Sequence, residues 1–168
     1  AFEGKKRSTD DMLDFYRSLL KEFQIVSMED PFSEDDVDGF VRASRELQCQ
    51  IVGDDFFCTN SDLLRKGIAA GAANAMLWKV NQIGTLTQAI DASDLAYRSG
   101  YSVMVSERSG ETEDPMIADI TVGLNAGQIK TGAPVRGERT AKYNRLLEIE
   151  RDLGSCARYA GKNFKVPF

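Results

Sequence analysis

The chain has 168 residues, the size of one domain, and its 42% hydrophobic and 28% charged residues are a balance typical of globular proteins. No run of about 18 apolar residues occurs, so we expect no membrane span. The net charge of -5 argues against a nucleic-acid or anionic-membrane surface.

Three cysteines and the lack of histidine limit the chemistry. Cys49, Cys58 and Cys156 have no CxxC spacing, which indicates free thiols and a cytoplasmic protein. Without histidine, the commonest acid-base side chain is missing. Catalysis then requires Lys, Asp, Glu or a thiol, and we expect any metal to be a hard ion.

Helical and extended patterns alternate along the chain. A capping pattern at Ser8 and Asp11 predicts a first helix. Its apolar stripe is expected to be Met12, Phe15, Tyr16 and Leu19. Predicted strands cover 24–28, 50–52, 75–80, 102–105 and 128–130. Predicted helices follow at 35–47, 61–69, 85–98, 115–124 and 137–153, and the last nine residues show no period. The inward residues of three later helices are predicted to be Val37, Phe40 and Val41; Leu86, Ile90 and Tyr97; Leu146, Ile149 and Leu153.

Five strands that are each followed by a helix indicate repeated βα units and a parallel sheet. Two architectures fit this order, an open doubly wound sheet and a (β/α)8 barrel. No G-x-G-x-x-G follows a strand, which weakens the dinucleotide-binding form of the first. A barrel typically needs eight units and about 250 residues, so a barrel requires this chain to hold only part of one.

Each predicted strand ends in polar residues that a core would not select. The C-terminal ends of parallel strands are where α/β folds bind ligands, so we expect these side chains to point into one crevice. They are Glu29, Asp54, Lys79, Arg108, Ser109 and Lys130. Lys79 follows Met76, Leu77 and Trp78 in a strand that we expect to be buried on both faces, where a lysine is rarely without a role.

Structural interpretations stay open beside the functional one. Glu29 or Asp54 can be ion-pair partners of Lys79 or Lys130. Other residues fit helix-initiating or solvent-facing carboxylates (Asp30, Asp55), first-turn acids of a helix (Glu111, Glu113) and core packing (Phe56, Phe57, Trp78).

The chemistry open to the strand-end residues is narrow. Two carboxylates on adjacent strands suit a hard divalent ion such as Mg²⁺. A lysine in an apolar strand beside a second lysine has its charged form disfavoured, so it can act as a base. Arg and Ser suit a phosphate or a carboxylate. A base, a metal ion and an anion-binding group together are typical of enzymes that abstract a proton next to a carboxylate, with the metal stabilising an enediolate.

Several segments carry a family resemblance. They are S-M-E-D-P-F, V-G-D-D, K-V-N-Q-I-G-T, S-x-R-S-G-E-T-E-D, G-Q-I-K-T-G-A-P and K-Y-N-R-L-L-E-I-E-R-D-L-G. These segments resemble the enolase (phosphopyruvate hydratase) family, the last of them its final barrel helix. The likeness runs from about Ile25 to Ala160. It implies an α/β fold, the C-terminal part of a TIM-like (β/α)8 barrel with about five βα units after a leading helix, as one partial domain over residues 1–168.

The resemblance also implies roles for individual residues. Glu29 and Asp54 match two of the three carboxylates that hold the tighter Mg²⁺. Lys79 matches the general base that removes the carbon-2 proton of 2-phosphoglycerate, and Lys130 matches the lysine that binds the substrate carboxylate. The loop that grips phosphate is matched by Ser106, Glu107, Arg108 and Ser109. The implied reaction is the reversible, glycolytic dehydration of 2-phosphoglycerate to phosphoenolpyruvate, with a homodimer as the full-length form.

Two departures from the family leave alternatives. The family has a histidine where this chain has Glu107. The lid domain, the first barrel units, the third metal carboxylate and the general-acid glutamates have no counterpart in the sequence. We therefore expect an incomplete enolase-type lyase that is not active by itself. The alternative is a catalytically impaired pseudo-enolase with a structural or binding role; another reaction of the superfamily fits the K-V-N-Q-I-G and G-Q-I-K-T-G segments less well.

Overall fold

The computed structural model describes residues 4–164 of the chain. Its helices are α1 (Thr9–Glu22), α2 (Val37–Glu46), α3 (Ser61–Ala70), α4 (Val80–Ile83), α5 (Leu86–Arg98), α6 (Met116–Gly123) and α7 (Gly137–Leu153). Its strands are β1 (Ser27–Glu29), β2 (Gln50–Gly53), β3 (Ala75–Trp78), β4 (Ser102–Ser106) and β5 (Ile129–Lys130). Short 3-10 turns cover Gly154–Cys156 and Gly161–Asn163. In this part of the chain, every helix is too short or too polar to span a bilayer.

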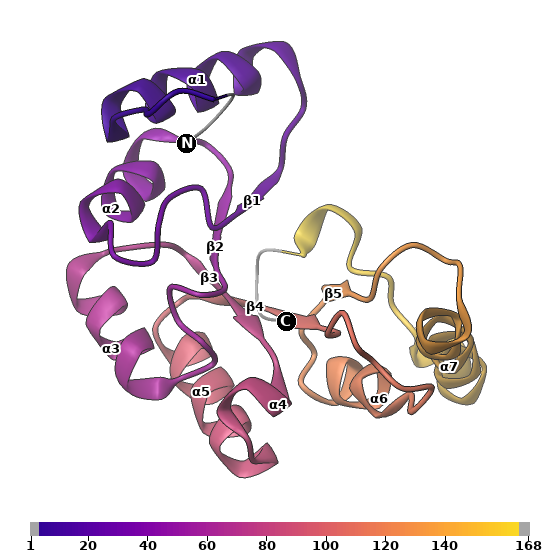
Figure 1. Ribbon diagram of the computed structural model, residues 1–168. Helices are drawn as coiled ribbons and strands as arrows, with labels where there is room; N and C mark the ends of the chain where they lie inside the picture. Colours follow the sequence, from indigo (N-terminus) through magenta and orange to yellow (C-terminus); the bar gives the residue numbers. More distant parts are fainter. Residues whose placement is uncertain (1–3, 165–168) are drawn as a thin grey trace.

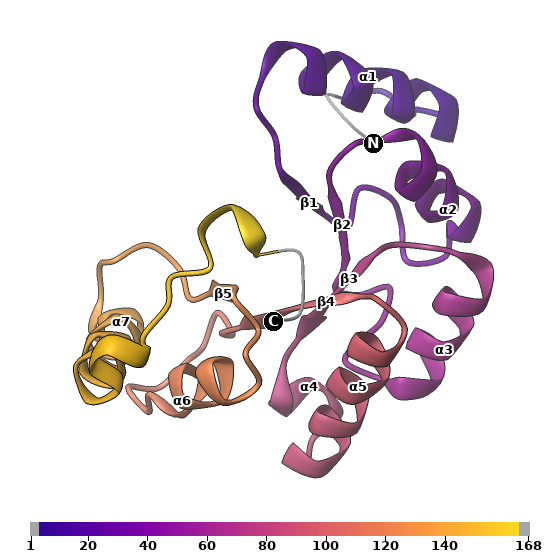
Figure 2. The ribbon, with the colours of Figure 1, turned by 180° about the vertical axis from the view of Figure 1, so that it is seen from behind.

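The strands of the described residues pair in parallel and lie side by side in chain order, from β1 to β5. Figure 1 shows the helices as an arc outside the strands, from α1 and α2 through α3 and α5 to α6 and α7. Figure 2 shows from behind that this arc stays open between α1 and α7. A doubly wound sheet carries helices on both faces, whereas a barrel carries them outside. The predicted α/β barrel portion is therefore confirmed.

Side chains that join distant strands show how strongly the sheet curves. Lys130 Nζ of β5 lies 2.5 Å from Glu29 Oε1 of β1. Gln50 in β2 and Gln128, just before β5, exchange two amide hydrogen bonds of 2.8 and 3.1 Å. In a flat sheet, four strand spacings would hold β1 and β5 roughly 19 Å apart. Because these side chains meet, the strands must form part of a barrel wall.

Strand residues alternate between the two sides of this wall. The helix side holds the main core, which includes Ile51, Met76, Trp78, Val103 and Val105 from the strands and Leu13, Phe40, Leu64, Ala89 and Ala92 from the helices. The concave side holds a smaller inner cluster of Val52, Ala75 and Leu77, with Met104 packed against it. The inner cluster occupies only the middle of the wall, which leaves the strand ends to polar residues.

The structure corrects some predicted boundaries. The first strand, predicted at 24–28, is Ser27–Glu29, because its pairing with β2 begins at Ser27 opposite Gln50. The four-residue helix α4 after Lys79 was too short for its period to be recognised. The last nine residues, predicted to be irregular, contain one 3-10 turn, Gly161–Asn163, in their described part.

Several predicted helix faces are also shifted. In α1 the residue that is fully buried is Leu13, outside the predicted stripe. In α5 the buried residues are Ala89, Ala92, Ser93 and Ala96. The predicted Val37, Leu86, Ile90 and Leu153 side chains are exposed, whereas Phe40 is buried as expected. Small residues let α5 approach β3 and β4 closely, so residue size rather than hydrophobicity selects its inner face.

Candidate functional site

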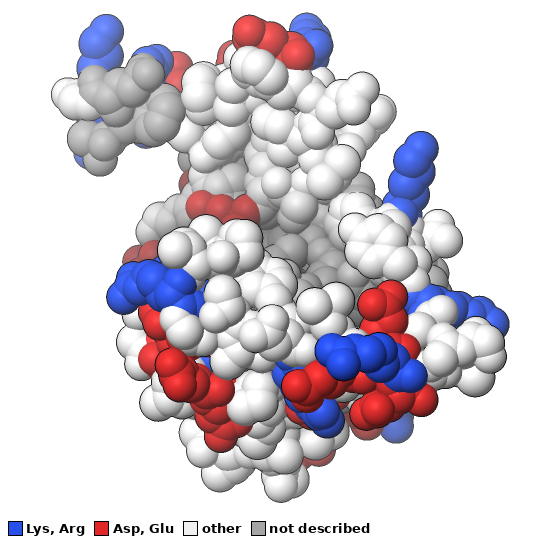
Figure 3. Space-filling view, turned by 90° about the vertical axis from the view of Figure 1, so that its right-hand side faces the viewer, with Lys and Arg blue, Asp and Glu red and all other residues white. Residues whose placement is uncertain are grey.

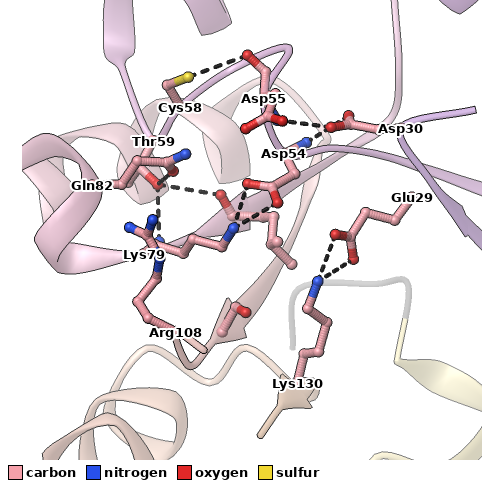
Figure 4. Close-up of polar contacts among 12 residues, drawn as sticks. Glu29, Asp30, Asp54, Asp55, Cys58, Thr59, Lys79, Gln82, Arg108 and Lys130 are labelled. Carbon is pink, nitrogen blue, oxygen red and sulfur yellow. Dashed lines mark hydrogen bonds and ion pairs between the residues drawn. The ribbon is translucent and has the colours of Figure 1, made fainter. Parts of the chain in front are cut away.

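The concave side of the sheet collects polar side chains at the strand ends. Glu29, Ser106 and Lys130 are the last residues of β1, β4 and β5, and Asp54 and Lys79 directly follow β2 and β3. Asp54, Lys79 and Ser106 each come two residues after a member or neighbour of the inner cluster, so strand alternation directs them to the same side. Figure 4 shows Glu29, Asp54, Lys79 and Lys130 converging from four strands.

Lys79 and Asp54 form a largely buried ion pair. Lys79 Nζ lies 2.7 and 2.6 Å from the two carboxylate oxygens of Asp54. The Lys79 and Asp54 side chains are 10% and 13% exposed. Lys79 is also held at its backbone, where its N–H donates to the Thr59 hydroxyl at 2.9 Å. The amine therefore has a fixed place at the inner edge of the sheet.

Glu29 and Lys130 form a second, more open pair. Lys130 Nζ lies 2.5 and 2.6 Å from the two Glu29 oxygens. The Lys130 side chain is 42% exposed and the Glu29 side chain 31%. Both carboxylates thus adopt the ion-pair arrangement that the sequence left open as a structural alternative. Each lysine faces a carboxylate, so the four charges balance.

The loop after β4 holds the other predicted residues. Ser106 is buried, and its hydroxyl donates to the Glu107 carbonyl at 2.9 Å. The Arg108 guanidinium donates to Asn81 Oδ1 at 3.3 Å. Ser109 is exposed and, with Arg108 and Asn81, lines an open hollow of about 550 Å³. A guanidinium beside a hydroxyl in an open hollow can bind phosphate.

Glu107 lies against α7. Its backbone N–H donates to the Lys130 carbonyl at 2.8 Å, which extends the pairing of β4 with β5 by one residue. Its carboxylate is 3.7 Å from the Arg139 guanidinium and its side chain is 11% exposed. Gly132 beneath them has φ +78°, and a Cβ there would come within 2.6 Å of Arg139 and 2.8 Å of Glu107. The Glu107–Arg139 contact therefore requires glycine at this position.

Three carboxylates gather beside the first ion pair. Oxygens of Asp30, Asp54 and Asp55 all lie within 4.8 Å of one another. Asp30 accepts the backbone N–H groups of Asp54 and Asp55, each at 2.8 Å. Burial raises the pKa of the Asp30 carboxyl, and these two hydrogen bonds oppose the rise. Asp30 thus holds the start of the loop after β2, a structural role that its position next to Glu29 did not reveal.

Cys58 lies in the same loop. Its thiol donates to the Asp55 carbonyl at 3.2 Å. Burial, and then the neighbouring Asp55, Asp54 and Asp30, raise the pKa of the Cys58 thiol. Because the thiolate is the nucleophilic form, this environment does not favour a catalytic thiol.

Sequence reasoning missed residues that hold the site from other elements. Thr59 contacts Lys79, and Arg139 contacts Glu107. Glu111, interpreted as a first-turn helix acid, lies before α6 and is 3.0 Å from the buried Lys142 amine. Arg139 and Lys142 are three residues apart, which places both on one face of α7. That spacing was the available signal, but nothing local indicated that this face meets the loop after β4.

Comparison with known proteins places the chain in a family. The family model described as "Enolase, C-terminal TIM barrel domain" matches residues 2–168. The enolase of Methanocaldococcus jannaschii is 61% identical over 166 residues, which cover 99% of this chain and 39% of that protein. The enolases of Methanococcus maripaludis and Thermococcus gammatolerans are each 59% identical, over 98% of this chain and 39% of their own length. The chain thus spans about 39% of the length of these curated relatives. It belongs to the enolase family, in which it corresponds to the C-terminal TIM barrel domain.

Proposed function

We propose that this chain supplies the base, the substrate-binding residues and part of the metal site of an enolase-type lyase. The reaction is the reversible dehydration of 2-phosphoglycerate to phosphoenolpyruvate. The observation that carries the proposal is the Lys79–Asp54 pair, with side chains 10% and 13% exposed, at the strand-end edge of a barrel wall. Barrel enzymes place their reacting groups at this edge, and a largely buried lysine rarely serves only to fill space in a core.

Each predicted residue has a role in this proposal. In its neutral form Lys79 Nζ accepts the carbon-2 proton. The carbon-3 hydroxyl takes a proton from a general acid in the rest of the longer enolase and leaves as water. Lys130 binds the substrate carboxylate through its amine, which reaches the same inner edge. The phosphate is bound by Arg108 and Ser109, which line the hollow, and Ser106 and Glu107 belong to the same substrate-binding loop.

Glu29 and Asp54 are proposed to hold Mg²⁺. Both offer only carboxylate oxygens, the donors that Mg²⁺ prefers, and the neighbouring strands β1 and β2 bring them to one edge. The amines of Lys79 and Lys130 lie 2.5 to 2.7 Å from these oxygens, so each carboxylate already has a cation beside it on the concave side of the sheet. When bound, the metal stabilises negative charge that develops on the substrate carboxylate.

Residues 1–168 are proposed to act as a partial barrel domain of a longer homodimeric enolase. The chain spans 39% of the length of its relatives, and residues for a lid and a general acid were not recognised in its sequence. The cytoplasmic location remains a prediction from the three cysteines, for which the described residues show no disulfide.

The test is a chimaera in which residues 2–168 replace the matching segment of the Methanocaldococcus jannaschii enolase. Lys79→Ala should abolish exchange of the carbon-2 proton while substrate still binds, because a general base contributes about 10²–10⁴-fold. Lys66→Ala, an exposed lysine on α3, is the matched control and should exchange normally. Exchange at the parental rate in the Lys79 variant would place the base elsewhere.

Glu107 favours a second candidate, a catalytically impaired pseudo-enolase. A carboxylate 11% exposed in the phosphate loop opposes an anionic substrate. Under this alternative the chimaera binds substrate weakly and exchanges the proton slowly even with Lys79 intact, and the Glu107 variants considered below separate the two cases.

A further inference from the structure

Thr59 has a backbone conformation that is unusual for a β-branched residue. Its φ is +54°, in the left-handed region, and Cys58 before it has φ +48°. A β-branched residue is a genuine outlier there, and glycine or asparagine would adopt this conformation more easily. Strain of this kind persists only where the surrounding structure imposes it, so a threonine at this place calls for a reason.

The surroundings do impose it. The loop from Asp54 to Asn60 is closed by backbone hydrogen bonds from Phe57 and Cys58 to the Asp54 carbonyl, at 3.1 and 2.8 Å. Phe57 is fully buried, and a Cβ on Gly53 would come within 2.5 Å of its ring. Burial of this phenylalanine ring anchors the loop, so the fold can hold a strained residue two positions further along the chain.

The Thr59 hydroxyl forms the hydrogen bonds with the end of β3 that a neighbouring strand would otherwise form. The ladder between β2 and β3 ends at Gly53 opposite Met76, so within residues 4–164 the end of β3 has no strand neighbour on that side. Thr59 Oγ1 accepts the Lys79 N–H at 2.9 Å and lies 3.3 Å from the Leu77 carbonyl. In a parallel ladder, the peptide group opposite a residue bonds to the groups that flank it. One fully buried hydroxyl thus replaces the missing partner opposite Trp78.

The same hydroxyl reaches the element that follows Lys79. Thr59 Oγ1 lies 3.2 Å from Gln82 Oε1 in α4, so its single proton has two acceptors. Lys79 is the N-cap residue of α4 and has no side-chain cap of its own. Figure 4 shows Thr59 and Asp54 holding Lys79 at opposite ends, the backbone and the amine. The loop after β2 therefore fixes both the backbone N–H and the side-chain amine of Lys79.

We propose that Thr59 is a positioning residue for Lys79: its hydroxyl fixes the peptide at the end of β3 and thereby the direction in which the lysine side chain leaves the strand. The inference rests on the proposed role of Lys79 as the base. A hydroxyl is required for it, and serine can supply one, whereas valine keeps the shape and removes the hydrogen bonds.

The test uses the chimaera with the M. jannaschii enolase described above. Thr59→Val should lower kcat about tenfold or more with KM within about twofold, since small misplacements of a reacting group have effects of this size. Thr59→Ser should restore kcat to within about threefold of the parent. Thr59→Gly, which relieves the backbone strain, should fold readily and still lose kcat. The matched control is Thr121→Val, which removes the buried hydroxyl bonded to the Ile117 carbonyl in α6 and should leave kcat unchanged.

Amide hydrogen exchange at Lys79 keeps the test independent of catalysis. Thr59→Val should speed exchange of the Lys79 N–H about tenfold or more, whatever Lys79 does in the reaction. Unchanged protection of that amide, or parental kcat in both Thr59→Val and Thr59→Gly, would overturn the positioning role. Failure of the proposed function would be recognised by a different result: the Lys79→Ala variant would still exchange the carbon-2 proton.

Discussion

At the scale of single residues, Glu107 shows how strand alternation decides what a charge does. Ser106 before it turns to the concave side, and Glu107 meets Arg139 of α7 on the other. Unit charges about 5 Å apart at an effective dielectric of about 20 repel by roughly 3 kcal/mol. Under the proposed function, Arg139 would offset part of this repulsion for a phosphate in the loop, so we expect the carboxylate to weaken substrate binding without excluding it.

We predict that Glu107→His in the chimaera raises kcat/KM for 2-phosphoglycerate about tenfold or more, because it removes a negative charge and adds a donor. Glu107→Gln separates the two effects. Loss of repulsion alone should lower KM in both variants, whereas a gain in kcat should appear only with histidine. Steady-state formation of phosphoenolpyruvate at saturating Mg²⁺ measures both. A fall in kcat/KM in both variants would show that the Glu107–Arg139 contact has a positive role.

At the scale of elements, α7 contacts the loops after β4 and β5, which adjoin the residues proposed to bind anionic groups. Arg139 meets Glu107 after β4, and the Tyr143 hydroxyl donates to the Gly132 carbonyl after β5. The Lys142 side chain is fully buried, with Nζ 2.5 Å from the Thr112 carbonyl and 3.0 Å from Glu111. Figure 3 views the molecule from the side of α7, where acidic and basic side chains are interspersed at the surface. The buried contacts, not this surface pattern, carry the attachment.

We predict that Lys142→Met in the chimaera lowers the free energy of unfolding by about 3 kcal/mol or more. The substitution leaves the mostly buried Glu111 carboxylate and the Thr112 and Glu138 carbonyls without their lysine partner. The control on the same helix is Arg145→Met. Arg145 pairs with Asp119 at 2.7 Å, but these side chains are 32% and 45% exposed, so its loss should change stability by less than about 1 kcal/mol. Urea unfolding measures both. Equal effects of the two substitutions would contradict a special role of the buried lysine.

At the scale of the whole molecule, the described strands form part of a barrel wall with two edges. β1 pairs only with β2 and β5 only with β4 in the sheet of residues 4–164. Unpaired strand edges recruit other chains, and apolar side chains near the β1 edge are exposed, with Phe23 at 54% and Val26 at 55%.

We predict that residues 1–168 produced alone associate through these edges, so that light scattering coupled to size exclusion finds dimers or larger species. Val26→Lys, next to β1, should reduce association because edge lysines oppose strand pairing. The chimaera, in which the enolase segment precedes β1, should not respond to this substitution in the same way. A monodisperse monomer of residues 1–168 that melts cooperatively would refute the prediction.

The order of elements was predictable because its signals are local. The capping box at Ser8 and Asp11 is present, and the predicted helix at 137–153 has the observed bounds. The strand-end positions of Glu29, Asp54 and Lys79 could be identified in the same way, since each follows a short apolar run. The inner face of α5 could not, because its alanines become the buried residues only when β3 and β4 lie against them.

The sequence by itself determined the βα order, the family, and the kinds of side chain at the strand ends, because periodicity and motifs depend on neighbours along the chain. Only the tertiary structure decided which polar groups meet: Lys130 reaches Glu29 across 101 residues, Lys142 of α7 reaches Glu111 in the loop before α6, and Thr59 reaches the backbone of Lys79. These contacts depend on the curvature of the sheet and on the packing of α7 against two loops. Both arise from many non-local contacts together, and no single segment encodes them.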